Sequence, residues 1–412
     1  MNKTFGTVLL VSGTMIGAGM LAMPLTSAGI GFAWTVVLLL VLWGLLTFSA
    51  LLFVEVYQTV DFDAGIGTLA ARYYGQAGRV LATTVMFVFL YALLSAYITG
   101  GGGIFMQAAQ ELGLVEVGLA EDAARRVHRA FIAGFTLFFG FFVVVSTSLL
   151  DGFNRVLFMV MLVALAVVIV VMLPAVRAEN LLAMPLDGAL LLSASPVFFT
   201  SFGFHGSIPS LNKYLRGDVR ALRFAVVAGS LLTLAGYVLW QLATHGVLSQ
   251  GQFTEILGRN PTLNGLVEAS RAMTGSAAIA RAVQVFSALA LVTSFLGVAL
   301  GLFDTIEDLL AKGLHVRANR LWLGVLTFLP PVLFAFFYPD FMAALRYAGQ
   351  MFAFFAVVLP VGLVWKARRR FPGLPYRVAG GDAALWLALL RGGAGACIPF
   401  LTGAGWLPVV AG

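Results

Sequence analysis

The sequence predicts an all-α integral membrane protein with eleven membrane spans, in which two inverted repeats of five helices are followed by an eleventh helix. Three observations support this prediction. Apolar residues dominate the whole length, hydrophobic runs of helical length recur along the chain, and two of these runs are interrupted by glycine and proline at corresponding places. We expect one transmembrane domain over residues 1–412, with repeats at about 5–174 and 188–366 and the extra helix at about 384–408.

The composition excludes an ordinary soluble protein. The chain is 60% hydrophobic and only 10% charged, whereas a soluble domain carries about 25% charged residues. This apolar excess is larger than one protein core needs, so most of the apolar surface must face lipid. The net charge of +7 does not indicate nucleic-acid binding, because the basic residues lie in short gaps between apolar runs and form no continuous face.

The hydrophobic runs set the number of spans, because a bilayer core of about 30 Å needs about 20 apolar residues per helix. The first run follows Lys3 but is too long for the apolar core of a signal peptide, so we expect it to be retained. The predicted spans are 5–30, 33–57, 80–108, 129–148, 154–174, 188–211, 222–245, 279–303, 319–338, 341–366 and 384–408.

Three long connections separate these spans. Residues 58–79 and 109–128 carry charges, and we expect loops with short helical pieces. Residues 246–278 are polar and glycine-rich, and we expect them to fold back over one mouth of the protein.

The distribution of Lys and Arg predicts the orientation. If the N-terminus is cytoplasmic, sixteen basic residues lie inside and eight outside, and Arg391 falls within the last span. The cluster from Lys366 to Arg370 is the strongest inside signal. We therefore expect a cytoplasmic N-terminus and a C-terminus on the opposite side.

The first and sixth spans contain residues that oppose a continuous helix. They are Gly13, Gly17, Gly19 and Pro24 in the first span and Gly203, Gly206 and Pro209 in the sixth. A glycine inside a helix costs roughly 1 kcal/mol and a proline about 3 kcal/mol, and irregular backbone in a membrane is tolerated only where it lines a cavity. An odd number of spans separates the two segments, so the second repeat is inverted relative to the first, as in transporters with discontinuous helices.

Two unwound spans can bind a zwitterion without a buried formal charge on the protein. Exposed N–H groups at a half-helix N-terminus suit a carboxylate, and free carbonyls can accept hydrogen bonds from an ammonium group. The alternative is that these glycines only allow close helix packing.

Three segments carry a resemblance to a known family. The stretches GTMIGAGMLAMP at Gly13–Pro24, FTSFGFHGSIPS at Phe199–Ser210 and ALVTSFLGVALGLFD at Ala290–Asp304 resemble helices one, six and eight of the hydroxy and aromatic amino acid permease family. This family is part of the amino acid–polyamine–organocation superfamily. The similarity covers nearly the whole chain, including Leu52–Tyr57 and Tyr91–Tyr97.

The resemblance implies a LeuT-like fold and uptake of an aromatic amino acid across the bacterial inner membrane by alternating access, with the C-terminus then periplasmic. Tyrosine is the first expected substrate, with tryptophan, phenylalanine or a broader aromatic range as the alternative. Proton symport is expected first, with sodium coupling or plain exchange as alternatives. Besides the substrate and the lipid bilayer, we expect no cofactor, no nucleic acid and no obligatory protein partner.

The resemblance also assigns substrate-binding residues. Thr14, Gly17, Ala18 and Gly19 match the carboxylate-binding bend, and Phe202, Gly203, Phe204 and His205 match the bend of helix six. His205 could hydrogen-bond a phenol or carry a proton, or it could be a structural histidine bonded to a neighbouring helix.

Four aromatic residues are further candidates for the substrate pocket. They are Tyr91, Tyr97, Phe295 and Tyr347. The two tyrosines are six residues apart on one helix, so they do not share a face, and we expect at most one to point at the substrate. Ordinary aromatic packing is the alternative for each.

Candidate groups for the coupling ion are Ala290, Thr293, Ser294, Glu55 and His205. In sodium-coupled relatives of this fold, hydroxyls at the positions of Thr293 and Ser294 contribute to a sodium site, and hard oxygen ligands suit that ion. The alternative is that these hydroxyls bond back to their own helix. Glu55 is a candidate because ionisable groups near the membrane are often functional, or else it pairs with an arginine. Helix five lacks the lysine that many proton-coupled members carry.

Other functional classes lack support. No His-x-x-His, Cys-x-x-Cys or Gly-x-Ser-x-Gly pattern occurs, so we expect no enzyme and no resident metal. A channel or a non-transporting amino acid sensor is the remaining alternative, although no polar ring typical of a selectivity filter is evident.

Overall fold

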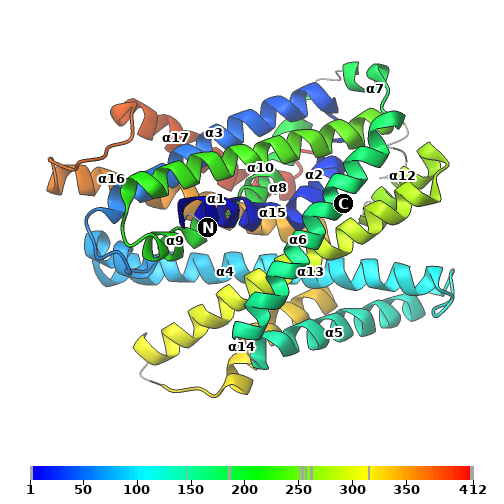
Figure 1. Cartoon of the computed structure of the whole chain (residues 1–412), viewed down its shortest axis with the longest axis horizontal. Helices are drawn as coiled ribbons and strands as arrows, with labels where there is room; N and C mark the ends of the chain where they lie inside the picture. The colour runs from blue at the N-terminus through cyan, green and yellow to red at the C-terminus, as the bar shows by residue number, and fades with distance from the viewer. Residues whose placement is uncertain are drawn as a thin grey trace.

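The chain forms a bundle of membrane-length helices (Figure 1). The computed structural model describes residues 3–145, 147–183, 187–249, 251, 255, 258–259, 263–313 and 316–408. Its first half contains α1 (Lys3–Met15), α2 (Ala18–Ser27), α3 (Gly31–Tyr57), α4 (Ile66–Glu111), α5 (Glu121–Val145), α6 (Thr147–Met172), the 3₁₀ turn η1 (Leu173–Ala175) and α7 (Ala178–Leu182). Its second half contains α8 (Gly188–Ser201), the 3₁₀ turn η2 (His205–Ser207), α9 (Ile208–Tyr214), α10 (Val219–Val247), α12 (Leu263–Thr274), α13 (Ala277–Asp308), the π-helical turn η3 (Leu309–Gly313), α14 (Arg320–Phe337), α15 (Phe341–Ala353), the π-helical turn η4 (Phe354–Val358), α16 (Leu359–Arg370) and α17 (Gly381–Gly403).

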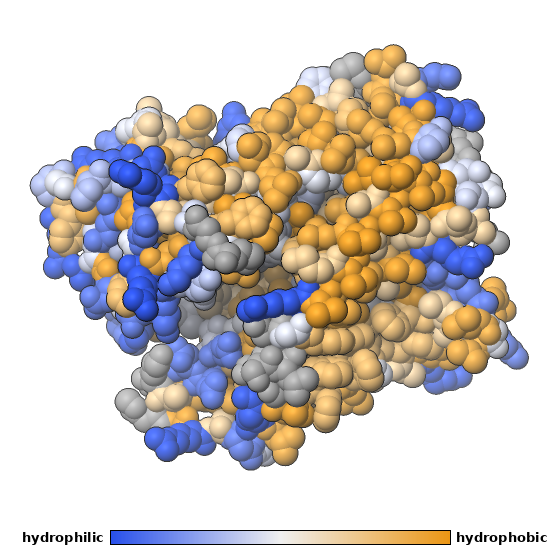
Figure 2. All heavy atoms as spheres, viewed as in Figure 1, coloured by the Kyte–Doolittle hydropathy of each residue, from blue (hydrophilic) through white to orange (hydrophobic). Residues whose placement is uncertain are grey.

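The predicted spans are present as helices. Ten helical segments of the described chain are long and apolar enough to cross a membrane, and the bent pair α1–α2 brings the total to as many as eleven. Figure 2 shows why a bilayer is needed: hydrophobic side chains cover the middle of the molecule, and hydrophilic ones gather at its two ends. The all-helical membrane fold predicted from the sequence is therefore confirmed.

The two interrupted spans run in opposite directions. In Figure 1, α2 lies to the right of α1, whereas α9 lies to the left of α8. Both spans are broken near their middles, α1–α2 after Met15 and α8–α9 after Ser201. Opposite direction with matching breaks is the arrangement expected of the first helices of two inverted repeats.

Three connections meet at one end of the bundle, which we call the basic end (left in Figure 1). The Asn212 side-chain amide donates a hydrogen bond to the Phe62 carbonyl at 3.1 Å. The Gln58 side chain exchanges two hydrogen bonds with the backbone of Tyr376. The loops after α3, α9 and α16 therefore form one layer, and they carry many of the basic residues expected on one side of the membrane.

The connections differ in detail from the predicted loops. Residues 66–79 belong to α4, which kinks at Gly75, where φ is 63°. Of the connection 246–278, the structure describes α12, which packs against α2, α4, α10 and α13, in line with the expected fold-back. Parts of this connection lie outside the described residues.

Candidate functional site

The first helix break lies where α1 ends and α2 begins. The two helices are bent by 48°, and Gly17 between them has an extended backbone with φ 178°. Any residue can adopt this conformation, so space is what requires glycine here. A Cβ atom at Gly17 would lie 2.2 Å from Oγ of Ser294 on α13. The Ser294 hydroxyl in turn accepts a hydrogen bond from the backbone N–H of Ala18 at 3.0 Å, so it caps the first turn of α2.

The second break separates α8 from α9. Phe202, Gly203 and Phe204 form a tight non-helical turn, in which the Phe204 N–H donates to the Phe202 carbonyl. A Cβ atom at Gly203 would lie 2.7 Å from the Thr200 carbonyl oxygen. Both phenylalanines are fully buried. The turn therefore fits only a residue without a side chain at position 203.

The two breaks touch each other. A Cβ atom at Gly19 would lie 2.9 Å from Oγ and 3.0 Å from Cα of Ser201, the last residue of α8. The start of α2 thus packs directly on the end of α8. Segments that are far apart in the sequence meet in the middle of the bundle, as the two-sided site predicted from the sequence requires.

One face of α10 lies along the whole first span and bonds to both of its halves. The contacts are Thr233 Oγ1 to Ser12 Oγ, Tyr237 Oη to the Met15 carbonyl, Trp240 Nε1 to the Met20 carbonyl, and His245 Nε2 with Ser27 Oγ. Two of these contacts precede the break and two follow it. α10 therefore bridges the two halves of the broken helix and holds them in place.

Sequence reasoning missed this face of α10. Its signal was present: Thr233, Tyr237, Trp240, Gln241 and His245 follow helical spacing and are polar in an otherwise apolar span. All five are buried. Buried polar groups need hydrogen-bond partners, and here the partners are the backbone and hydroxyl groups of α1 and α2.

His205 is bonded to a neighbouring helix. Its Nε2 lies 2.8 Å from Ser49 Oγ and 3.1 Å from the Leu46 carbonyl, both on α3. Because a carbonyl can only accept, the Leu46 contact requires a proton on Nε2. Nδ1 is buried and has no partner among the described residues.

An aromatic cluster surrounds this histidine. The rings of Phe53, Phe204 and Phe352 lie within about 6.3 Å of the His205 ring, and Phe352 stacks on Phe89 of α4 at 5.0 Å. A Cβ atom at Gly203 would come within 3.7 Å of Phe89 and 3.8 Å of Phe352. Phe89 and Phe352 were not among the residues predicted from the sequence, although both lie beside the second break.

The four predicted pocket aromatics lie in different places. Tyr97 is buried close enough to Tyr237 for electrostatic interaction, whereas the Tyr91 hydroxyl donates to the Leu326 carbonyl of α14, away from the breaks. Phe295 packs between rings of α5 and α14. Tyr347 is 56% exposed. Of this group, these contacts bring Tyr97 near the breaks, and the pocket roles of Tyr91, Phe295 and Tyr347 stay predictions.

The predicted ion-binding hydroxyls have different partners. Thr293 Oγ1 bonds back to the Leu289 and Ala290 carbonyls of its own helix at 2.9 and 3.2 Å. The Ser294 hydroxyl instead reaches the first break, as described above. Thr14 is exposed, and its hydroxyl bonds back to the Leu10 carbonyl, so it does not face the junction of the breaks.

Glu55 is paired rather than free. Its carboxylate is fully buried and accepts two hydrogen bonds from the Arg368 guanidinium at 2.6 and 2.8 Å, and a third from the Val378 N–H at 2.8 Å. It lies at the basic end, next to the loop after α16. This geometry corresponds to the arginine-paired alternative for Glu55.

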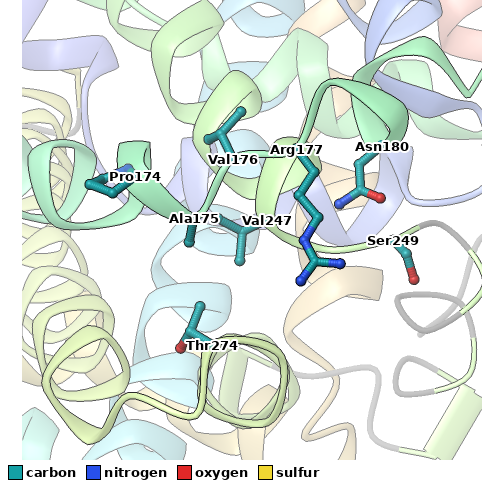
Figure 3. A pocket seen from close by; sticks show the side chains of 8 residues that line it. All are labelled: Pro174, Ala175, Val176, Arg177, Asn180, Val247, Ser249 and Thr274. Carbon is teal, nitrogen blue, oxygen red and sulfur yellow. The ribbon is translucent and has the colours of Figure 1, made fainter.

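The surface of the described residues is hollowed near α1 and, separately, near the end of α10. Figure 2 shows the surface hollowed between α1 and α13, beside α6. A separate cavity of about 280 Å³ lies at the end of α10 opposite to the basic end, where the Arg177 side chain points into it (Figure 3). Hydrogen bonds from the Arg177 N–H and the Asn180 amide to the Gly246 carbonyl hold its wall against α10.

Comparisons with known proteins place these features in a family. The family model described as the tryptophan/tyrosine permease family matches residues 1–399. The chain is 59% identical to tyrosine-specific transport system 1 of Haemophilus influenzae, covering 100% of both chains. It is 52% identical to tyrosine-specific transport system 2 of the same organism, covering 100% of this chain and 99% of the relative.

The fold also matches a solved structure. The crystal structure of MhsT in complex with L-phenylalanine covers 95% of this chain and 98% of its own, with a TM-score of 0.60 and 16% sequence identity. At this identity the likeness concerns the fold, and it confirms the LeuT-like architecture.

Proposed function

Because the chain belongs to the tryptophan/tyrosine permease family, we propose that it is a secondary active carrier that imports L-tyrosine by cation symport with alternating access. Protons are the first candidate for the coupling cation. The observation that carries the proposal is the contact between the two helix breaks, Gly19 against Ser201, in the middle of a membrane bundle. Two relatives named for tyrosine transport, at 59% and 52% identity, support tyrosine as the substrate.

The geometry of the breaks supports recognition of an amino acid backbone. The N-terminus of α2 presents backbone N–H groups with partial positive charge, which suit a carboxylate. The unwound turn 202–204 that follows α8 carries backbone carbonyl oxygens, which suit an ammonium group. The cluster around His205, with Phe89 and Phe352, supplies an aromatic surface beside Gly203 that suits the substrate ring.

Alternating access is supported by the hollow between α1 and α13 (Figure 2). α1 is separated from α2 by two residues, so it can tilt relative to α2 once the hydrogen bonds from Thr233 and Tyr237 of α10 to α1 are released. Tilting of this half-helix would open or close a path from one side of the membrane to the junction of the breaks. We place the basic end in the cytoplasm of a bacterial inner membrane, because cytoplasmic loops carry the excess of Lys and Arg.

Uptake of labelled tyrosine into proteoliposomes tests this function. We expect saturable uptake that an inward proton gradient drives above equilibrium, and competition by tryptophan weaker than by tyrosine. Gly203→Leu, which fills the second break, should insert but bind no tyrosine. Linear, unsaturable flux would show a channel, and binding without flux would show a sensor.

Measuring tyrosine uptake under a proton gradient and then under a sodium gradient identifies the coupling ion. If protons drive uptake, Thr293→Ala should leave it intact, because that hydroxyl bonds only within its own helix and to Met161 Sδ in the contacts described. Uptake that follows the sodium gradient alone would overturn proton symport.

A further inference from the structure

The hydroxyl of Tyr237 joins the ends of both broken helices. It lies 2.7 Å from the carbonyl oxygen of Met15, the last residue of α1, and 2.6 Å from that of Ser201, the last residue of α8. The tyrosine is fully buried on α10. Its ring packs edge-on against Phe202 with centroids 5.1 Å apart, which keeps the hydroxyl in place.

The two carbonyl oxygens create a region of negative electrostatic potential inside the membrane. The last carbonyls of a helix have no partner within that helix, and each helix C-terminus carries roughly half a negative charge. Here two such ends face one point. A small cation or an ammonium group would satisfy this arrangement, yet a neutral phenol lies there, and the charged or titratable residues of α10, which are Arg220, Arg223 and His245, lie near its ends.

A phenol has one proton for two acceptors. The hydroxyl lies at hydrogen-bond distance from both carbonyl oxygens, 2.7 Å from Met15 and 2.6 Å from Ser201, so it can donate to either one. The hydroxyl thus links the two helix ends through one polar atom that lies between their carbonyl oxygens. The other α10 contacts described above, from Thr233, Trp240 and His245, each reach only the first span.

We propose that Tyr237 is a positioning residue that stands in for a bound cation between the two helix breaks, so that this junction is assembled for tyrosine without sodium. The inference rests on the proposed function, since tyrosine binding is its readout. It goes beyond that function because it assigns a specific hydroxyl to the place where an ion would otherwise be required.

The test measures the tyrosine Kd of the purified protein in lipid nanodiscs, first in potassium buffer without sodium and then with sodium added. Tyr237→Phe should weaken binding about tenfold to a hundredfold without sodium, since it leaves two buried carbonyls without a donor. Tyr237→Asn has space and an amide oxygen for an ion. Sodium should therefore strengthen binding to Tyr237→Asn about tenfold more than it strengthens binding to the wild type.

The matched control is Tyr73→Phe. It removes another buried tyrosine hydroxyl, which bonds Thr59 Oγ1 at 2.7 Å near the basic end. This variant should bind tyrosine as the wild type does in both buffers.

The outcomes separate the two proposals. Absence of tyrosine binding by the wild type would count against the proposed function. A wild type that binds tyrosine, together with Tyr237→Phe that binds equally well, would overturn the role of Tyr237. If Tyr237→Asn binds tyrosine weakly and sodium does not improve that binding, the Tyr237 hydroxyl has only a structural role and does not replace a cation. If Tyr237→Phe does not fold, the sodium dependence of Tyr237→Asn decides.

Discussion

At the scale of single residues, the glycines of the first break are required by what packs against them. Gly17 has an ordinary extended backbone, but a Cβ atom there would lie 2.2 Å from the Ser294 hydroxyl oxygen and would force it to move. The same hydroxyl caps α2 by accepting from the Ala18 N–H. A side chain at position 17 would therefore displace the cap as well as fill the bend.

Gly17→Ala should weaken tyrosine binding about tenfold, since it breaks a buried hydrogen bond to the end of α2. Adding Ser294→Gly should recover part of the loss, because it restores space but not the cap. Gly44→Ala is the control, as nothing lies within 4 Å of a Cβ atom there. The measurement is equilibrium binding of labelled tyrosine. Full affinity in Gly17→Ala would contradict the close approach of Ser294.

At the scale of elements, α10 holds the broken first span in shape. A helix with two unpaired ends in a membrane needs partners for its free backbone groups. Tyr237 and Trp240 supply donors to the carbonyls of Met15 and Met20, on either side of the break. The geometry of the break therefore depends on a helix from the second repeat.

Trp240→Phe should lower both the thermal stability and the tyrosine affinity. It removes the donor to Met20 and leaves a void in a fully buried site, at a cost of about 1–3 kcal/mol. Trp43→Phe removes a comparable indole donor, to Ser230 Oγ, but far from the break. This second variant should lose stability and keep its affinity, as measured by thermal unfolding and by binding. Equal affinity losses in both variants would contradict a specific role of α10 in bridging the first break.

At the scale of the whole molecule, the loop after α16 ties distant helices together at the basic end. Glu55 of α3 binds Arg368 of α16 and the backbone of Val378. Gln58 pairs with the backbone of Tyr376, and the Arg223 guanidinium of α10 lies 4.0 Å from the Tyr376 ring centroid. These contacts link both repeats and the loop that leads to α17.

Glu55→Gln should destabilise the protein by about 3–5 kcal/mol, the range for breaking a buried ion pair by removing one partner. Glu121→Gln removes an exposed partner of Arg125 and should change the unfolding midpoint little. Thermal unfolding in detergent measures both. If Glu55→Gln instead keeps its stability and loses only proton-driven uptake, then Glu55 is a coupling group and not a structural one.

The spans and their breaks could be predicted from the sequence because the bilayer imposes strict rules on local composition. Span length and hydropathy follow from membrane thickness, and glycine and proline at Gly17, Pro24, Gly203 and Pro209 disturb a helix wherever it packs. Residue roles that depend on partners were harder to predict. Tyr91 and Tyr97 were equal candidates, and only the rotation of α4 against α14 separates them.

The sequence by itself determined that the chain is a helical membrane protein with two interrupted spans, because these properties depend on each segment and on lipid alone. Only the tertiary structure decided that Ser294 caps the first break, that Tyr237 joins both breaks and that Glu55 pairs with Arg368. The physical reason is that helical periodicity shows which residues share a face but not which neighbouring helix meets that face. A buried polar group must find a partner, and the packing of the bundle decides which one it finds.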